Sequence, residues 1–406
     1  MYRYHSAVPR PAAYVRNRGA AVNLMLHRIL MRPLLNSGTM GGHLNAVPPR
    51  GCNDRRFSVA SICRRANRFY CRRVSDVPGD TLPTDVQALE DDARKYPQSE
   101  WRQSRFLTSF CRGELYRHPR RGELILDYLS RFPRSSAAKS AAVHPDPVAA
   151  PDTFKAVEAF WLELRKGQPN DVDFAIGHAA LVANDDPSRS TEILRDAITL
   201  LPKNASLWTE LGRVAPEPLQ SLEALKTARA LGSDQPNLIV WIGRAAVGAG
   251  RPDDVYEVGC ELMSRANQTR ETVRSPVGWE GVGRGAWTQI RAALENSPDR
   301  PELIHALSEY ANDTHWAHTF LGLVAAEQGQ LSEAGKHLER SAAIWAEPRM
   351  SSYGPSFLLA NKLCELRMWK DVERFLVACK NLWNDQILED WIQEIKNERT
   401  PAFEEP

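Results

Sequence analysis

The stretch that decides the fold is residues 204–236, NASLWTELGRVAPEPLQSLEALKTARALGSDQP. It contains two segments of helical pattern separated by a short turn, and small residues recur in both. The stretch ends in a proline, and another proline stands 34 residues before that one, at 202. Helix pairs repeated at this period predict a stack in which each pair packs on the next. The residues that carry the pattern are Trp208, Leu211, Gly212, Ala224, Ala228 and Pro236.

Prolines continue this period toward the N-terminus. They follow one another at intervals of 36, 36, 33 and 34 residues. A proline cannot continue a helix, so it is favoured where one helix pair gives way to the next. No stretch shows strand alternation or a hairpin turn. We therefore predict an all-α fold, an α-solenoid of helix-turn-helix repeats. The prolines are Pro97, Pro133, Pro169, Pro202 and Pro236.

Composition and helical pattern divide the chain into five parts. We expect a basic, disordered arm at 1–80, helical hairpins at 81–135, an Ala/Pro linker at 136–152, repeats at 153–270, and an irregular loop followed by further repeats at 271–406. In the last part, Pro298 and Pro301 predict a turn before a short helix at 302–310, with a new repeat marked by Leu321 and Gly322. Trp208 is expected to be a buried packing residue.

The N-terminal arm differs from the rest in charge. Residues 1–75 contain 14 Arg, no Lys and one acid, Asp54, so they carry +13 in a chain whose net charge is +2. Mitochondrial presequences have this composition, and so do arms that bind nucleic acid or anionic lipid. We favour a third interpretation, a disordered extension from an overlong start, with Met25, Met31 and Met40 as later starts.

Seven cysteines, an odd number with no C-x-x-C pair, give little support to a zinc site or a disulfide framework. No apolar run reaches the roughly 20 residues that a membrane helix needs. A cytoplasmic protein is therefore expected, with mitochondrial import as the alternative if the source is eukaryotic. The oligomeric state stays open.

The motifs resemble the tetratricopeptide repeat (TPR) family, and the last 50 residues are similar to those of a group of uncharacterised bacterial repeat proteins. The match is best at 207–236 and 318–344 and covers about half of the chain. The family's fold implies that the first helix of each pair lines a concave groove. Its groove positions map here onto Phe174, His178, Thr209, Arg213, Val240 and Arg244.

Three of these six residues, His178, Arg213 and Arg244, occupy one repeat position on successive helices. A basic row beside apolar positions suits a partner protein or peptide that is acidic, because arginine binds carboxylates with two parallel hydrogen bonds. The alternative is that each Arg is solvated or pairs with a nearby acid such as Glu210. The Lys and Asn clamp of the chaperone-binding members is absent at the matching positions, so the resemblance does not imply a chaperone tail.

Other candidates for chemistry are weak. His315 and His318 lie one helical turn apart, but no third metal ligand follows at a recognisable distance. The glycine-rich segment 278–285 matches neither a dinucleotide-binding motif nor a phosphate-binding loop. We therefore predict no catalytic set, no cofactor and no metal.

The leading hypothesis is a non-enzymatic scaffold that binds a protein or peptide partner through the concave face of a TPR solenoid. The first alternative is a regulatory or enzyme-accessory protein with a ligand cleft near 278–285. The second, less favoured, is nucleic-acid binding through the Arg-rich arm.

Overall fold

The computed structural model describes residues 82–111, 113–273, 300–344, 354–382 and 386–403, together with 288–290, 292 and 294. Helices and turns make up this part of the chain, and no strand occurs in it. The expected arm at 1–80 and the glycine-rich segment 278–285 lie outside these residues. The N-terminal helices are α3 (Thr84–Lys95), α4 (Glu100–Ser109), α5 (Arg121–Arg131) and α6 (Pro151–Gly167), with 3-10 turns η2 (Gly113–Arg117), η3 (Ala137–Lys139) and η4 (Ala141–Val143).

The central and C-terminal helices follow in pairs. They are α7 (Val172–Val182), α8 (Pro187–Leu200), α9 (Ala205–Val214), α10 (Pro218–Ala230), α11 (Leu238–Gly248), α12 (Pro252–Thr272), α14 (Arg300–Glu327), α15 (Leu331–Ala342), α17 (Leu358–Glu365), α18 (Trp369–Cys379) and the final helix α19 (Gln386–Lys396).

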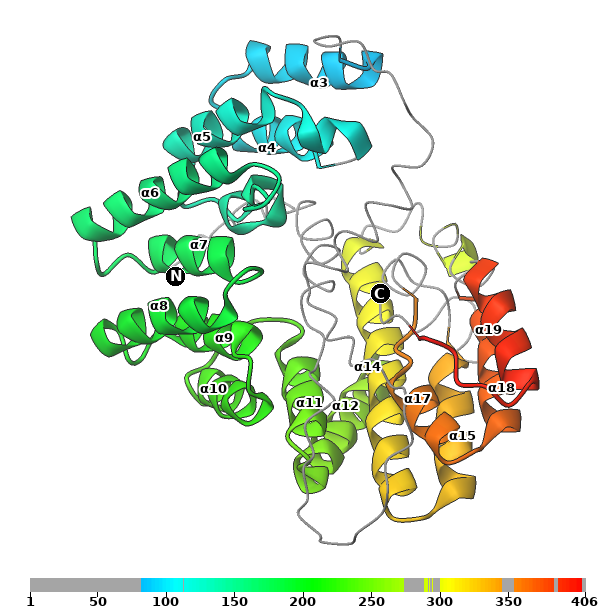
Figure 1. Ribbon diagram of the computed structural model, residues 1–406. Coiled ribbons are helices and arrows are strands. Elements are labelled where there is room, and N and C mark those ends of the chain that lie inside the picture. Colours follow the sequence, from blue (N-terminus) through cyan, green and yellow to red (C-terminus); the bar gives the residue numbers. More distant parts are fainter. Residues whose placement is uncertain are drawn as a thin grey trace, which may run out of the picture.

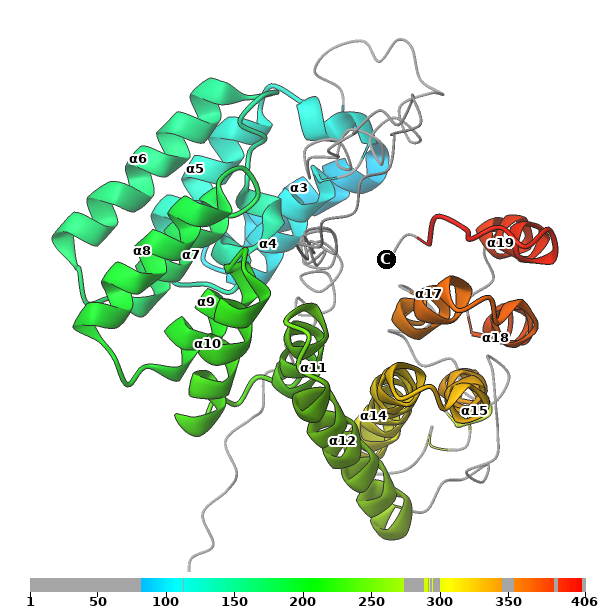
Figure 2. The ribbon, with the colours of Figure 1, turned by 60° about the horizontal axis from the view of Figure 1, so that its bottom comes forward.

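The helices pack in series along the chain. Each helix from α6 to α12 contacts the next, α12 lies against α14, and α14 pairs with α15. Figures 1 and 2 show α3–α10 on one side of the molecule and α14–α19 on the other, joined through α11 and α12. Both views place α14 and α17 nearer the N-terminal side than α15 and α18. The predicted all-α solenoid is confirmed.

Small residues allow the helices to cross closely, as the sequence predicts. A Cβ added to Gly212 would lie 2.5 Å from Leu225 Cγ on the second helix of the same pair. A Cβ on Gly322 would lie 2.3 Å from Leu359 Cδ2 and 3.0 Å from His337 Cβ. Because such separations are far inside van der Waals contact, glycine is needed at these crossings.

Local sequence sets where the helices begin. Asp171 accepts hydrogen bonds from the backbone N–H groups of Asp173 and Phe174 at 3.0 and 3.2 Å, and Asn204 caps α9 through Leu207 N at 3.1 Å. These side chains satisfy amide groups that have no partner inside the helix. The second helices of three successive pairs start on a proline, whose fixed φ suits the first helical turn. These prolines are Pro187, Pro218 and Pro252.

Two of the turns within pairs depend on a left-handed glycine. Gly250 and Gly329 have φ of +63° and +72°. In both turns the following residue donates a hydrogen bond back to the last helical turn, with Arg251 N to Ala246 O at 3.0 Å and Gln330 N to Ala325 O at 2.8 Å. Glycine is favoured here because a side chain is strained in this backbone region.

The segment expected to be a linker at 136–152 is packed against the body. Ala138 and Val143 are fully buried, and the guanidinium of Arg121 donates to the backbone oxygens of Ala142 and His144 at 3.3 and 3.2 Å. Its Ala and Ser residues are small enough to lie close to α7, which η3 contacts. Helix α6 then starts at Pro151, two residues before the predicted start.

The turn predicted around Pro301 is wrong. Helix α14 runs without interruption for 28 residues and includes both the expected short helix at 302–310 and the repeat marked by Leu321 and Gly322. Pro301 is the second residue of this helix, where its missing N–H costs nothing because that amide would have no helical acceptor. Helix α12 packs along the extended α14.

The buried apolar side chains form three clusters in chain order, one at the N-terminal hairpin, one from α4 to α10 and one from α10 to the C-terminus. Trp208 contacts the last two clusters, but it is only partly buried, and its Nε1 donates to Pro202 O at 2.8 Å. The prediction that Trp208 is buried is therefore wrong in part, because its ring lies at the border between two clusters.

Candidate functional site: the inner row of α7, α9 and α11

The six predicted groove residues lie on three helices, each the first of its pair. Phe174 and His178 are on α7, Thr209 and Arg213 on α9, and Val240 and Arg244 on α11. We call these three helices the inner row. The structure separates the six residues into a buried group of four and a partly exposed pair of arginines.

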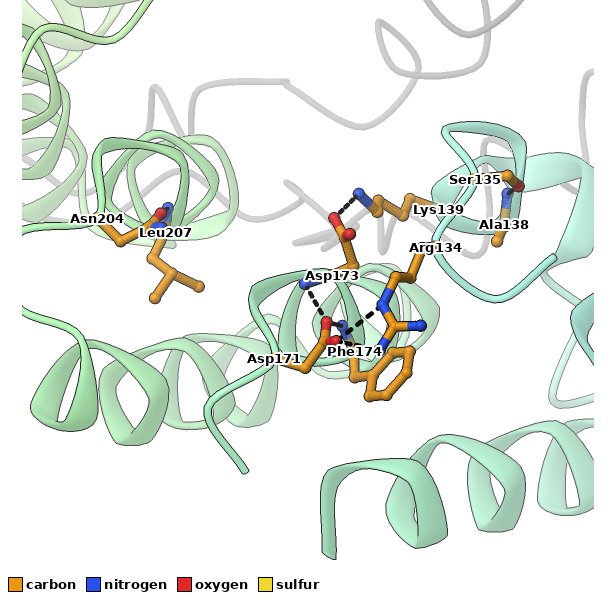
Figure 3. Close-up of polar contacts among 9 residues, drawn as sticks. All are labelled: Arg134, Ser135, Ala138, Lys139, Asp171, Asp173, Phe174, Asn204 and Leu207. Carbon is orange, nitrogen blue, oxygen red and sulfur yellow. Dashed lines mark hydrogen bonds and ion pairs between the residues drawn. The ribbon is translucent and has the colours of Figure 1, made fainter. Parts of the chain in front are cut away.

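Phe174 is 1% exposed and does not line an open surface. The guanidinium of Arg134 lies over its ring, 4.7 Å from the centroid, and is held there by Asp171 at 2.8 Å (Figure 3). Lys139 on η3 pairs with Asp173 beside it (Figure 3). Arg134, just before the segment expected to be a linker, and Lys139 within it therefore cover the start of α7.

His178 is also buried, at 1% exposure. Its Nδ1 lies 3.0 Å from Nη1 of Arg165 on α6, so the neutral ring accepts a hydrogen bond from the guanidinium. Burial, and then the nearby Arg165 and Arg189, lowers the pKa of His178 to about 4. A neutral, enclosed imidazole cannot serve as a cation for an incoming carboxylate, so the prediction that His178 belongs to a basic row is wrong.

Thr209 and Val240 complete the buried group. The Thr209 hydroxyl lies 2.9 Å from both Ala205 O and the Ser233 hydroxyl, and the residue is 1% exposed. Val240 is 5% exposed and belongs to the C-terminal cluster. Both side chains are buried, so the prediction that they line a groove is wrong for these positions as well.

Arg213 and Arg244 are only partly exposed, and each lies against a tryptophan of a later helix pair. The guanidinium carbon of Arg213 is 5.0 Å from the ring centroid of Trp241 on α11. That of Arg244 is 5.8 Å from the ring centroid of Trp316 on α14. Each guanidinium is thus held on an aromatic ring of another helix through cation–π attraction.

Arg213 already holds a carboxylate. Its Nη1 lies 2.6 and 2.8 Å from the two oxygens of Glu210, one helical turn earlier, and its side chain is 9% exposed. The pair shows that the guanidinium is oriented for a carboxylate. It also means that an acidic ligand must compete with Glu210 for this position.

Sequence reasoning did not assign the tryptophans of this row to the site. Trp241 is expected from its helical spacing to be a packing residue, and Trp316 is 3% exposed and packs on Phe320 with ring centroids 5.4 Å apart. The only sequence signal for Trp241 is its position three residues before Arg244 on the same predicted helix, and Trp316, 72 residues after Arg244, has no spacing that assigns it to the site.

The histidines at 315 and 318 have structural partners. Nδ1 of His315 lies 2.9 Å from Ser341 O, and its Nε2 accepts from Ser356 N at 2.9 Å. Nδ1 of His318 lies 2.9 Å from Nδ1 of His337 on α15. Among the described residues, no group of three or more His, Cys, Asp or Glu side chains is placed to hold a metal ion.

An open hollow of about 480 Å³ lies outside the inner row, between α12 and α14. Cys260, Met263, Asn267 and Leu321 are among its lining residues. None of the six predicted residues borders it. In the described part of the chain, no helix has the length and apolar content needed to cross a membrane.

Comparisons with known proteins give distant likenesses among solved structures. No family model and no curated protein matches the chain. Among solved structures, the chain is similar to the TPR domain of P58(IPK), with 12% sequence identity and a TM-score of 0.17 over 77% of this chain and 92% of that one. At so low a TM-score this likeness supports no statement about function.

Proposed function

We propose that this protein is a non-enzymatic scaffold whose inner row binds an acidic segment of a partner protein. Stacked helix pairs present long continuous surfaces, and proteins built this way use them to hold extended partners. The observation that carries the proposal is the pair of arginines, Arg213 and Arg244, each held on a tryptophan of a later helix pair. A partner segment with more than one carboxylate would offer an acceptor to each guanidinium group.

The proposal makes Glu210 a competitor of the partner. While Glu210 is paired with Arg213, a ligand carboxylate must replace it. The ligand then gains only the difference in interaction free energy between its own pair with Arg213 and the Glu210 pair. Removing that negative charge should free the guanidinium and strengthen binding. Charge reversal of Arg213 and Arg244 should therefore weaken binding of the acidic partner, whereas removal of the Glu210 charge should strengthen it. A purely structural role for these residues does not predict such opposite effects.

The test uses a fluorescein-labelled peptide of alternating Glu and Leu and its Gln counterpart, measured by fluorescence anisotropy. We expect the acidic peptide to bind the wild type more tightly than the Gln peptide, and the Arg213→Glu, Arg244→Glu double variant to lose this difference. Glu210→Gln should raise affinity about tenfold, corresponding to the roughly 1.4 kcal/mol of a charge-assisted hydrogen bond.

Arg251→Glu is the matched control, because it reverses the charge of an exposed arginine in the α11–α12 turn. It should bind as the wild type does. The proposal is wrong if the double variant and the control bind the acidic peptide equally well, or if Glu210→Gln weakens binding while the protein stays folded.

A further inference from the structure

The first helical hairpin has two large aromatic side chains at its surface. Trp101, in the first turn of α4, is 50% exposed, and Tyr96, which follows α3, is 39% exposed. Most large apolar side chains of a folded domain are covered, so two aromatic rings exposed on one hairpin require an explanation. Figure 1 shows this hairpin, α3 and α4, at one end of the stack.

Three cations lie against these rings. The guanidinium carbon of Arg102 is 3.6 Å from the Tyr96 ring centroid, Lys95 Nζ is 5.5 Å from the same centroid, and Arg105 is 5.4 Å from that of Trp101. We call these five residues the basic-aromatic patch. Its two rings and three cations lie within 11 residues of the chain, from 95 to 105.

The chain around the basic-aromatic patch has an excess of positive charge. Residues 94–134 contain ten basic and four acidic residues, whereas the whole chain is nearly balanced at +2. Arg102 pairs with Asp92 at 3.0 Å, but Lys95 and Arg105 have no carboxylate within ion-pair distance among the described residues. These two cations therefore remain available for an anionic ligand.

The hairpin holds the patch in a fixed shape. Nε2 of Gln103 donates to Ala93 O at 2.6 Å, which ties α4 to the last turn of α3. Phe106 and Phe110, on the opposite side of α4, are buried with ring centroids 5.3 Å apart. The core of the hairpin thus uses other aromatic residues, and packing does not account for Tyr96 and Trp101.

We infer that the basic-aromatic patch binds single-stranded nucleic acid. Exposed aromatic rings supply stacking faces for bases, and neighbouring Lys and Arg side chains contact the phosphates. Both components are present here within one helical hairpin. The bases of a duplex are already stacked on each other, so double-stranded nucleic acid can use the cations but not the rings.

The experiment measures binding of a fluorescein-labelled 20-nucleotide poly(U) strand to the full chain over a series of salt concentrations. Trp101→Ala should weaken binding about tenfold at every salt concentration, because a stacking contact contributes roughly 1–3 kcal/mol and involves no counterion. Lys95→Glu with Arg105→Glu should weaken binding and reduce the slope of log K against log salt by about 1.4, at roughly 0.7 for each lost phosphate contact.

Every variant keeps the arm, whose +13 charge could itself attract RNA, so two controls test whether the loss of binding belongs to the patch and not to any exposed ring or cation. Tyr256→Ala removes a ring on α12 that is 55% exposed, and Lys203→Glu reverses an exposed cation between α8 and α9. Both should bind poly(U) as the wild type does. The melting temperature of each patch variant should stay within about 2 °C of the wild type, because the altered side chains are at the surface.

Three results would overturn the inference. The first is that Trp101→Ala binds poly(U) with wild-type affinity, which would assign any binding to charge alone. The second is that a duplex of the same length binds as tightly as the single strand and is weakened equally by Trp101→Ala. The third is that vesicles containing phosphatidylserine bind in a Trp101-dependent way while poly(U) does not, which would assign the patch to a membrane surface.

Discussion

Single residues determine how closely the helices of this protein approach. Gly177 shows the principle on α7, where an added Cβ would lie 2.5 Å from the Trp161 ring, and Trp161 is itself fully buried. Gly243 shows it again on α11, where the added atom would lie 2.4 Å from Phe320. In both places the missing side chain makes room for a large ring from another helix.

Gly212→Ala tests this at the α9–α10 crossing. The new methyl group would lie 2.5 Å from Leu225 and 3.0 Å from Ser221 O, so the helices must separate. We expect a loss of about 1–3 kcal/mol in the free energy of unfolding, measured by urea denaturation. Gly167→Ala in α6 is the control, since its Cβ meets no atom within 4 Å. The control should be neutral or stabilising by up to about 1 kcal/mol, and equal losses in both variants would contradict this account.

Buried histidines should make stability depend on pH. Burial, followed by the nearby His337 and Arg340, lowers the pKa of His318 to about 3 from an ordinary 6.5, and the pKa of His337 is lowered as well. The unfolded chain then binds protons below pH 6.5 that the folded chain does not. The contribution of these neutral histidines to the free energy of unfolding should therefore be complete above pH 6.5. It should fall as the pH drops from 6.5 toward 3.

The measurement is the free energy of unfolding of wild type and His318→Gln between pH 7 and pH 5. His318 alone accounts for at most roughly 1.4 kcal/mol for each pH unit below 6.5. The variant should lose less stability over this interval than the wild type. Parallel curves for the two proteins would show that His318 does not contribute.

At the level of elements, the short C-terminal segment after α19 acts as part of the last pair. The Phe403 ring stacks on Phe357 with centroids 5.3 Å apart and planes 5° apart, and it meets Trp391 edge-on at 5.2 Å. Phe403 is 9% exposed, and Pro401 before it is buried. The segment thereby packs on the Phe357 ring at the start of α17 and on the Trp391 ring of α19.

Phe403→Ala should lower the free energy of unfolding by about 3 kcal/mol, the lower end for loss of a buried phenylalanine. Ala402→Ser, next to it and exposed, should change stability by less than about 0.5 kcal/mol. Thermal melting followed by circular dichroism compares the two. If Phe403→Ala has the same melting temperature as the wild type, the Phe403 ring contributes nothing to the stability of this region.

The elements also show what could be predicted from the sequence. The helix pairs from α7 to α12 were predictable because glycine, alanine and proline recur there at a constant period. The length of α14 was not predictable, because proline is common both in turns and in the first turn of a helix. The sequence alone does not distinguish these two positions for Pro301. The six groove residues were assigned by repeat position alone, and position does not reveal that Arg134 covers Phe174 or that Arg165 encloses His178.

At the scale of the whole molecule, stability is distributed along the stack and not gathered in one centre. The two larger clusters meet near Trp208, and each consists mainly of contacts between consecutive helices. In such a chain a local defect weakens its neighbours first. The N-terminal and C-terminal parts should therefore differ in how they respond to the same kind of substitution.

Gly322→Val tests this, because its side chain would collide with Leu359 and His337 between α14, α15 and α17. Amide hydrogen exchange followed by mass spectrometry should show faster exchange across α14–α18. Peptides from α7–α9 should keep protection close to that of the wild type. Uniform loss of protection over the whole chain would instead indicate a single cooperative unit.

The folded-back C-terminal segment bears on how copies of this protein can associate. An open stack of repeats invites a further copy to add to its last pair, and head-to-tail addition without closure produces fibres. Here the rings of Phe357 and Trp391 are already covered by Phe403 of the same chain. Another chain would have to displace the Phe403 ring before it could pack on Phe357 and Trp391, so this surface is closed to head-to-tail addition while the segment is in place.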